Sequence, residues 1–212
     1  MKGISQSLGR NAKQVAEGYD WAGLEPGATV VDVGGGNGHI SIALAEEFPH
    51  LNFVVQDLPG AVEEATGTVP AALQERVKFQ AHDMFTPQPV QGAAVYFLRH
   101  ILHDWPDSHA ILILKALVPA LRSGSRVLVS DSVVPPPGVL HGQEEKFVRY
   151  LDLQMMVLHN AKERSEEDWK RVFEEADSRL VYRKVWRKGE SVSAVSTLEA
   201  VFQDGDEGIK GT

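Results

Sequence analysis

The sequence predicts an α/β fold: a doubly wound, mostly parallel seven-stranded sheet with helices on both faces and an antiparallel last strand. Two observations support this prediction. Apolar runs short enough for buried strands alternate with segments of helical apolar spacing over most of the 212 residues. This alternation is typical of a parallel sheet whose strands are connected by helices. Because no internal repeat, low-complexity tract or interior linker interrupts the pattern, we expect one Rossmann-like domain over residues 1–203.

Each expected strand is an apolar or β-branched run bounded by glycine, proline or charged residues. The strands are 28–34, 51–57, 77–83, 93–99, 125–134, 179–187 and 195–202. Apolar residues three and four positions apart predict the helices. These are 39–48, 106–121, 144–158 and 165–176, with two short helical pieces at 61–65 and 71–75. Ser165 and Asp168 form a capping-box pattern at the start of the last helix. The polar, glycine-rich tail 204–212 is predicted to be disordered.

Composition limits the class of protein and the partners. Apolar residues make up 43% of the chain, which is enough for a full core, yet no apolar run is long enough to cross a membrane. The N-terminus lacks the apolar stretch of a signal peptide, so we expect a soluble, cytoplasmic protein. The chain has no cysteine, which excludes disulfides and thiolate chemistry. A net charge of −8 disfavours nucleic acid and anionic membranes as partners.

The clearest local signal is the run Asp32-Val-Gly-Gly-Gly-Asn-Gly38, between a predicted strand and a predicted helix. Glycines there allow a tight turn and a close approach of the backbone to a ligand. The dinucleotide fingerprint fails because its third glycine position is His39, and no Gly-Lys-Ser/Thr ending indicates a P-loop. The run fits D-x-G-x-G-x-G, which favours a different nucleoside-containing ligand; a tight turn without a ligand is the alternative.

Carboxylates end the next two predicted strands. Asp57 can accept hydrogen bonds from both hydroxyls of a ribose. Its alternative role, capping the segment that starts at Leu58, is compatible with the first. Asp83 can accept from an adenine amino group while Met84 packs on the ring, although Met84 and Phe85 could equally be core residues.

The segment Arg99-His-Ile-Leu-His-Asp-Trp-Pro-Asp107 collects titratable residues directly after the fourth predicted strand. The carboxyl ends of parallel strands meet at one edge of a sheet, so we expect this segment to lie beside the glycine run, where ligands bind. His103 could instead cap the following helix. His100 and His103 are three residues apart and could share a metal, but no third ligand has a recognisable spacing. The sequence therefore predicts no metal site.

Six motifs in this order extend these observations: VVDVGGGNGHIS, FVVQDLPG, AHDMF, LRHILHDWPD, LVSDSVVPP and NAKERSEEDW. Together they resemble class I S-adenosylmethionine-dependent small-molecule O-methyltransferases of the caffeic-acid and flavonoid type, in particular the fungal secondary-metabolism branch. The resemblance extends from about Tyr19 to Phe202. It implies S-adenosylmethionine as cofactor and, as acceptor, a hydroxyl of an aromatic or polyketide-like small molecule.

The resemblance also implies roles for three catalytic residues. His103 is expected to be the general base, since a neutral imidazole can take a proton from a hydroxyl near pH 7. Asp131 and Glu163 are expected to orient it. Many relatives have Glu at the position of Asp131, so Asp131 reaches one methylene less far. The alternatives are a strand-end hydrogen-bond acceptor for Asp131, and for Glu163 a loop charge paired with Lys162 or Arg164.

Two further groups of residues follow from the resemblance. The cofactor would be held by Gly34, Gly36, Asp57, Leu58, Asp83, Met84, Phe85, Arg99 and Trp105. The acceptor pocket would include Met155, Met156, His159 and Asn160. Methionine suits flat aromatic ligands because its thioether is polarisable and adaptable, although Met155 and Met156 could also fill core.

Members of the resembling family carry an N-terminal helical domain that dimerises and closes the acceptor pocket, and this sequence starts where that domain would end. We therefore expect weak activity from this chain alone. We also expect exposed apolar surface around residues 1–24 or along helix 144–158, and a homodimer or self-association. Two other functions remain open: an enzyme that keeps the cofactor but catalyses a pericyclic reaction or a dehydration, and an inactive binding module.

Overall fold

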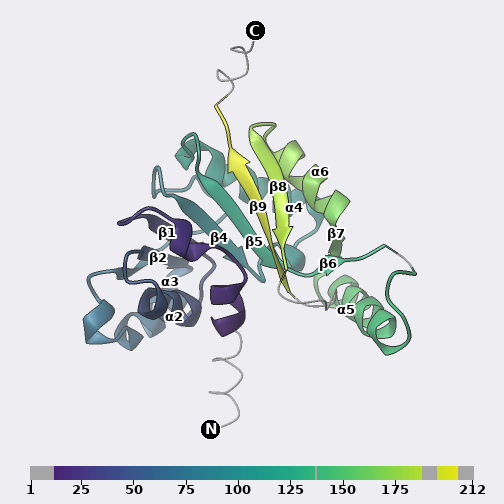
Figure 1. Ribbon diagram of the computed structural model, residues 1–212, viewed down its shortest axis with the longest axis horizontal. Helices are drawn as coiled ribbons and strands as arrows, with labels where there is room; N and C mark the ends of the chain where they lie inside the picture. Colours follow the sequence, from purple (N-terminus) through teal and green to yellow (C-terminus); the bar gives the residue numbers. More distant parts are fainter. Residues whose placement is uncertain (1–11, 137, 188–194, 205–212) are drawn as a thin grey trace.

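The computed structural model describes residues 12–136, 138–187 and 195–204 (Figure 1). Its main sheet has seven strands in the order β3-β2-β1-β4-β5-β9-β8. The first five are parallel, whereas β9 runs antiparallel to both β5 and β8. The predicted fold class, including the antiparallel last strand, is confirmed. Residues 205–212 of the predicted disordered tail lie outside the described residues.

The main strands are close to those predicted. They are β1 (Thr29–Val33), β2 (Asn52–Asp57), β3 (Val77–Ala81), β4 (Val95–Arg99), β5 (Arg126–Asp131), β8 (Leu180–Trp186) and β9 (Ser196–Phe202). After a helical segment over 12–17, the α-helices are α2 (His39–Glu47), α3 (Pro59–Ala65), α4 (Asp107–Leu117), α5 (Gln143–His159) and α6 (Glu166–Ala176). Short 3₁₀ turns are η1 (Trp21–Gly23), η2 (Thr66–Thr68), η3 (Ala71–Leu73), η4 (Leu102–Asp104) and η5 (Val118–Ala120). The helical turns over 12–17 and the turn η4 were not predicted, while the capping box of α6 is confirmed.

The predicted strand 125–134 is wrong in one respect, because the structure divides it at Ser132. In the described part of the chain, β9 starts at Ser196, opposite Asp131, so the pairing of β5 with β9 ends there. The chain then forms a two-residue strand, β6 (Val133–Val134), which pairs in parallel with β7 (Arg164–Ser165). This small second sheet brings the segment before β7, which contains Glu163, to the end of β5.

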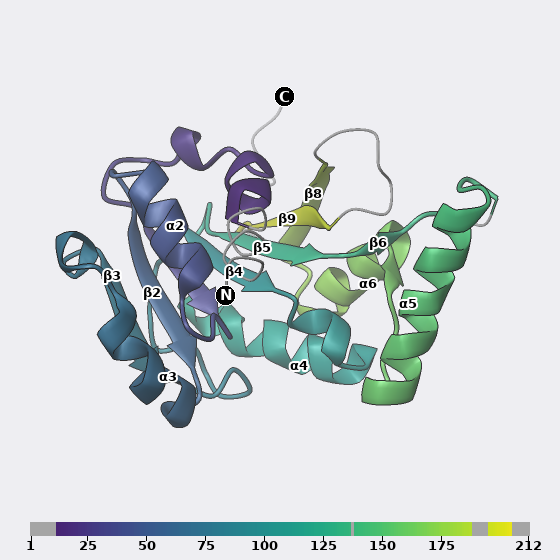
Figure 2. The same cartoon turned by 90° about the horizontal axis from the view of Figure 1, so that it is seen from below.

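The core has two layers because successive strand residues face opposite sides of the sheet. One face packs against α4 and α6 through a fully buried set: Val31, Leu98, Val129, Ile113, Trp169 and Phe173. The other face packs against α2 and the N-terminal segment, with Val30, Phe97, Leu128, Leu44 and Trp21 buried. Figure 2 shows these helices on opposite sides of the sheet. Helices on both faces are therefore confirmed.

Exposed apolar surface was predicted either around residues 1–24 or along helix 144–158. In the structure, the exposed apolar surface lies along the helix. In the described part of residues 1–24, Val15, Tyr19, Trp21 and Leu24 are buried, and the Trp21 indole donates to the Val15 carbonyl at 2.9 Å. Helix α5, by contrast, projects from the body of the molecule (Figures 1 and 2).

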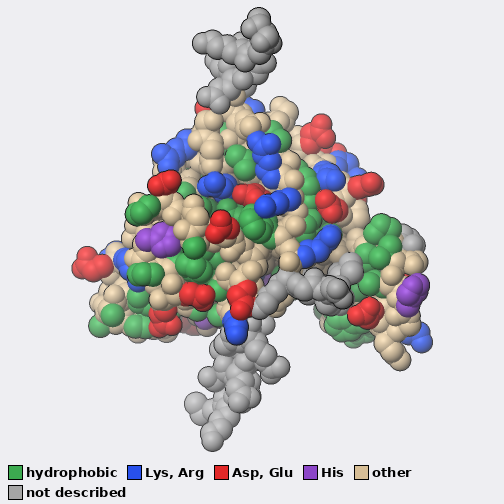
Figure 3. Space-filling view, in the orientation of Figure 1, with side chains coloured by type: hydrophobic (Ala, Val, Ile, Leu, Met, Phe, Trp, Pro, Cys, Tyr) green, Lys and Arg blue, Asp and Glu red, His purple; other side chains and the backbone are tan. Residues whose placement is uncertain are grey.

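Only one residue of α5, Val148, is buried in the described structure. Its exposed large apolar side chains are Phe147, Tyr150, Leu153, Met156, Val157 and Leu158. In the space-filling view, hydrophobic side chains gather on this projecting helix (Figure 3). No helix among the described residues is both long and apolar enough to cross a membrane.

Candidate active site

The predicted site residues converge on the edge where the parallel strands end. β1 runs into the glycine loop at Gly34, β2 ends at Asp57, β4 at Arg99 and β5 at Asp131. In open sheets with this topology, ligands bind beyond the carboxyl ends of the strands. The structure therefore places the glycine loop and the His103 segment at one edge, as predicted.

The glycine loop is tightly packed on one side and open on the other. Gly34 and Gly35 donate backbone hydrogen bonds to the Gln56 carbonyl at 2.8 and 3.0 Å. Gly34 has a φ of 73°, and a Cβ there would lie 2.5 Å from Cδ1 of Ile101. Gly36 also has a positive φ, 56°, but a Cβ there would meet no described atom within 4 Å. The loop thus leaves space for a ligand at Gly36, directly against the backbone.

Asp57 fastens this loop to the end of β2. Its Oδ2 accepts the Gly36 N–H at 2.8 Å and its Oδ1 accepts the Leu58 N–H at 2.8 Å. The bond to Leu58 is the local capping contact considered as an alternative role. A carboxylate has about four acceptor positions, so the half-buried Asp57 can also accept from a ligand.

Two charged groups lie beneath the loop. Asp32 is almost fully buried and accepts the Ser41 hydroxyl at 2.6 Å; burial raises the pKa of Asp32 to about 6. Burial lowers the pKa of Arg99, while the nearby carboxylates of Asp32 and Asp131 oppose that shift. Arg99 Nε is buried and donates no hydrogen bond within the described structure. Arg99 is thus a partly buried cation within electrostatic reach of both Asp32 and Asp131.

One cavity is lined both by residues predicted to bind the cofactor and by residues predicted to bind the acceptor. It has a volume of about 580 Å³ and is lined by Met84, Asp104, Trp105, Pro106, His109, His159 and Asn160. Phe85 supports it from the core, packing edge-on to Trp105 with ring centroids 4.8 Å apart. Asp83 is exposed, accepts the Phe85 N–H at 3.0 Å and is not among the lining residues within the described structure.

His103 lies on η4 between two carboxylates. Its Nδ1 is 3.5 Å from Oε1 of Glu163, and its Nε2 is 3.5 Å from Oδ1 of Asp104. Burial alone would lower the pKa of His103, but Glu163, Asp131 and Asp104 outweigh it and raise the pKa above the ordinary value. The arrangement favours the protonated imidazole that a general base becomes when it takes a proton.

Asp131, which was predicted to orient His103, also lies beside a second histidine, His100. Its Oδ1 lies 3.6 Å from Nδ1 of His100, while its charge still acts on His103. The carboxylate is fully buried, and neither oxygen accepts a hydrogen bond in the described structure. His100 adopts a left-handed φ of 53°, and its ring lies 5.3 Å from that of His103. The structure thus supplies the third ligand-type residue that the sequence did not reveal.

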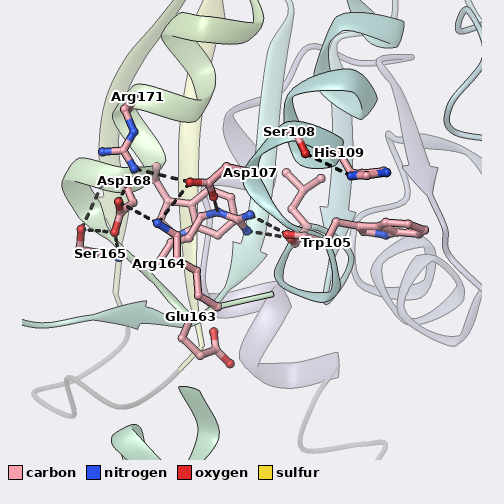
Figure 4. A network of polar contacts seen from close by, with 12 residues as sticks. Trp105, Asp107, Ser108, His109, Glu163, Arg164, Ser165, Asp168 and Arg171 are labelled. Carbon is pink, nitrogen blue, oxygen red and sulfur yellow. Dashed lines mark hydrogen bonds and ion pairs between the residues drawn. The ribbon is translucent and has the colours of Figure 1, made fainter. Parts of the chain in front are cut away.

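Sequence reasoning gave Arg164 no role beyond a possible partner for Glu163. Its side chain is fully buried, and its guanidinium donates to the Leu102 and Trp105 carbonyls at 2.7 Å each and to Asp107 at 2.8 Å (Figure 4). These bonds hold both sides of η4, and therefore His103. Arg164 stands in a polar run, which is typical of a surface loop. Its burial is therefore seen only in the tertiary structure.

Glu163 points away from the Arg164 network (Figure 4). Its backbone N–H donates to Oδ1 of Asp152 on α5 at 2.9 Å. The alternative pairing of Glu163 with Lys162 or Arg164 is not observed in the described structure, because both cations pair with Asp107. Glu163 is therefore available to His103.

Of the four predicted acceptor residues at the end of α5, two line the cavity and two do not. His159 and Asn160 line the cavity, and Nε2 of His159 is 3.6 Å from Oδ1 of Asp104. Asn160 ends the helix in the left-handed conformation, with φ 52°. Met155 is half-buried and Met156 is 56% exposed, and neither is among the described lining residues.

The fold and the site together define an α/β domain with a nucleoside-type ligand loop and a candidate base at the strand ends. A profile described as "O-methyltransferase domain" matches residues 1–178. The chain belongs to the O-methyltransferase domain family. The family resemblance proposed from the motifs is confirmed.

Individual relatives agree with this assignment. The chain is 43% identical over 205 residues to "Grayanic acid biosynthesis cluster O-methyltransferase" of Cladonia grayi, covering 96% of this chain and 45% of that protein. Among solved structures, "Structure of the Mitomycin 7-O-methyltransferase MmcR" is similar with a TM-score of 0.78 and 32% identity, covering 93% of this chain and 54% of that one. "The structure of LepI complex with SAM" is similar with a TM-score of 0.74 and 32% identity, covering 88% and 46%. The chain thus spans about half the length of these proteins.

Proposed function

We propose that this chain is the cofactor-binding and base-bearing part of an S-adenosylmethionine-dependent O-methyltransferase, and that its acceptor is a hydroxyl of an aromatic or polyketide-like small molecule. The observation that carries the proposal is the position of His103. It lies between Glu163 and Asp104, and Asp104 and Trp105 line the cavity that also contains His159 and Asn160.

The residues present fit the cofactor. The loop is open at Gly36, Asp57 retains acceptor capacity, and Met84 and Trp105 line the same cavity. The residues that would hold it are Gly34, Gly36, Asp57, Leu58, Asp83, Met84, Phe85, Arg99 and Trp105. When bound, S-adenosylmethionine supplies an electrophilic methyl group. The complex of LepI with SAM, named above, supports this choice of ligand.

The chain's own contribution is to deprotonate and orient the acceptor. A phenol or enol becomes a good nucleophile when it loses its proton, and the His103 imidazole can accept that proton. Glu163, 3.5 Å from Nδ1, and the buried charge of Asp131 then stabilise the imidazolium. His159 and Asn160 offer polar groups that can hold the acceptor hydroxyl near the base.

A second function is favoured by one specific observation. Another structure similar to this chain, with a TM-score of 0.74 and 32% identity, is described as "A Pericyclic Reaction enzyme". A cofactor that stays intact and acts only through its charge would use the same glycine loop and Asp57. The cofactor site therefore does not distinguish methyl transfer from a rearrangement.

The mass of the product separates the two. The chain, alone and joined to the N-terminal half of a fungal relative, would be incubated with S-adenosylmethionine and a panel of phenolic and polyketide compounds. Methyl transfer adds one methylene to the acceptor and produces S-adenosylhomocysteine in equal amount. A product of unchanged mass would replace the proposal with the second function. Cofactor binding without any product from the panel would instead favour a non-catalytic binding module.

A further inference from the structure

We propose that His100, His103 and Asp131 form a binding site for a zinc-type divalent transition-metal ion. Each residue offers one ligand atom, and these atoms lie within 4.8 Å of one another. Two of the residues come from the segment after β4 and the third ends β5, so two neighbouring strands of the sheet fix the cluster. The donor set is two imidazole nitrogens and one carboxylate oxygen.

The buried carboxylate is what makes this a built site rather than a surface cluster. Asp131 is 0% exposed, and neither of its oxygens accepts a hydrogen bond from a described residue. Nδ1 of His103 is also buried, and its 3.5 Å separation from Oε1 of Glu163 is longer than an ordinary hydrogen bond. A buried charge is costly unless it is paired or coordinates a metal, and a dication placed among these atoms satisfies Asp131 and His103 together.

The distances are close to those of a tetrahedral site. Bonds of about 2.0–2.1 Å to zinc place neighbouring ligand atoms about 3.4 Å apart. Nδ1 of His100 and Oδ1 of Asp131 are already 3.6 Å apart. The widest separation in the cluster, at most 4.8 Å, would have to close by roughly 1.4 Å to reach that tetrahedral value. The His100 side chain is 34% exposed, so its ring has room to move.

The surroundings of His103 resemble those of a metal ligand. A metal-binding histidine usually donates its other ring N–H to a carboxylate, which fixes the tautomer and orients the ring. Here Nδ1 faces Glu163 and Nε2 faces Asp104, each at 3.5 Å. Whichever nitrogen binds the ion, the other therefore faces a carboxylate that could accept its N–H.

Charge and donor type indicate the kind of ion. Asp131, Glu163 and Asp104 bring three negative charges to His103, and Arg99 is a cation within electrostatic reach of Asp131. The resulting excess of negative charge attracts a dication. Imidazole ligands favour zinc, cobalt and nickel over magnesium and calcium, which prefer all-oxygen sites.

Metal binding would have a direct consequence for the base. A His103 nitrogen that coordinates the ion cannot accept a proton, so the ion would reversibly inhibit methyl transfer. This consequence rests on the proposed function, whereas binding of the ion does not.

The test is therefore a binding experiment on the tag-free chain without cofactor or acceptor. Titration with cobalt(II) should give the visible ligand-field bands of a four-coordinate ion, reach an end point at one ion per chain, and be reversed by zinc. His100→Asn and Asp131→Asn should each weaken binding by about tenfold or more, a loss of the order seen when the coordination of a metal site is impaired. Asparagine tolerates the left-handed backbone of position 100.

His141→Asn is the matched control, since His141 is exposed and belongs to no described cluster of metal-ligating side chains. It should bind as the unchanged chain does, and circular dichroism should show that all three variants are folded. Absence of a one-to-one complex would overturn the proposal, and so would binding that both cluster variants retain in full. Neither result bears on methyl transfer, which the product-mass experiment tests separately.

Discussion

The proposed cofactor side and the proposed acceptor side of this sheet edge differ in how completely the chain builds them. On the cofactor side, Gly34 and Gly36 are hydrogen-bonded to Gln56 and Asp57, and the loop is packed against buried neighbours. On the acceptor side, α5 projects from the body and exposes an apolar face. For the proposed function, this difference predicts that the chain binds the cofactor by itself and that a closed acceptor pocket needs a further surface over α5. The chain spans about half the length of its relatives, which leaves room for such a surface in the longer proteins.

The largest expected effect is on the base. His103→Ala should lower turnover by about 10²–10⁴-fold, because general-base catalysis contributes about this factor. The affinity for S-adenosylhomocysteine, measured by calorimetry, should stay near that of the unchanged chain. Turnover would be measured on the chain joined to the N-terminal half of a relative. Full turnover in the variant would mean that the acceptor ionises without His103, and a parallel loss of cofactor affinity would make His103 a structural residue.

The next largest effect is expected at Arg164, which holds the turn η4 and therefore His103. Arg164→Met removes three hydrogen bonds from a fully buried guanidinium and leaves Asp107 without this buried partner. Asp107 keeps Lys162 and Arg171, but the carbonyls of Leu102 and Trp105 lose their donor, and each buried acceptor left unsatisfied costs about 1–3 kcal/mol. Urea unfolding should show this loss. Arg171→Met, at a half-exposed arginine on the same network, is the control and should leave the midpoint close to that of the unchanged chain. Equal midpoints for the two variants would contradict the anchoring role of Arg164.

A third prediction tests the charge buried beneath the glycine loop. Burial raises the pKa of Asp32 from 3.8 to about 6, so the folded state keeps this proton to a higher pH than the unfolded chain does. The resulting stability is full below pH 3.8 and is lost as the pH rises through about 6. Asp32→Asn should therefore gain stability relative to the unchanged chain over this range, levelling at about 3 kcal/mol. Urea unfolding at several pH values measures it, with the exposed Glu63→Gln as a control that shows no such trend. A pH-independent difference for Asp32→Asn would place its pKa near the ordinary value.

The smallest expected effect distinguishes the two roles of Asp57. Asp57→Ala should weaken binding of S-adenosylhomocysteine by about 1–3 kcal/mol, because charge-assisted hydrogen bonds to the ligand are lost. The Gly36 N–H also loses its acceptor, so some loss of stability is expected as well. Calorimetry and urea unfolding on the same variant separate the effects. Unchanged affinity with reduced stability would leave Asp57 only its role in holding the loop.

The sheet and most of its edge could be predicted because they depend on local patterns. Alternating strands and helices predicted a mostly parallel sheet with helices on both faces, and the predicted strand ends indicated that Gly34, Asp57 and Arg99 would lie at one edge.

The parts that could not be predicted depend on contacts distant in sequence. Arg164 is buried through bonds to residues near position 105, and nothing in its own neighbourhood indicates that. The predicted strand 125–134 is divided at Ser132, where the pairing of β5 with β9 ends, and β9 is distant in sequence. The proximity of His100 to Asp131 needs the left-handed backbone of His100, which no sequence pattern in this segment indicated.

The most direct test of the account compares the chain alone with the chain joined to the N-terminal half of a fungal relative. Cofactor affinity and turnover of a phenolic acceptor would be measured on both. The affinity for S-adenosylhomocysteine should be the same in both forms within about twofold, a difference of about 0.4 kcal/mol. The chain alone should turn over far more slowly than the joined form, since the acceptor is poorly oriented without a closed pocket. Turnover by the chain alone at roughly 1 s⁻¹, the low end for ordinary enzymes, or cofactor binding that appears only in the joined form, would contradict it.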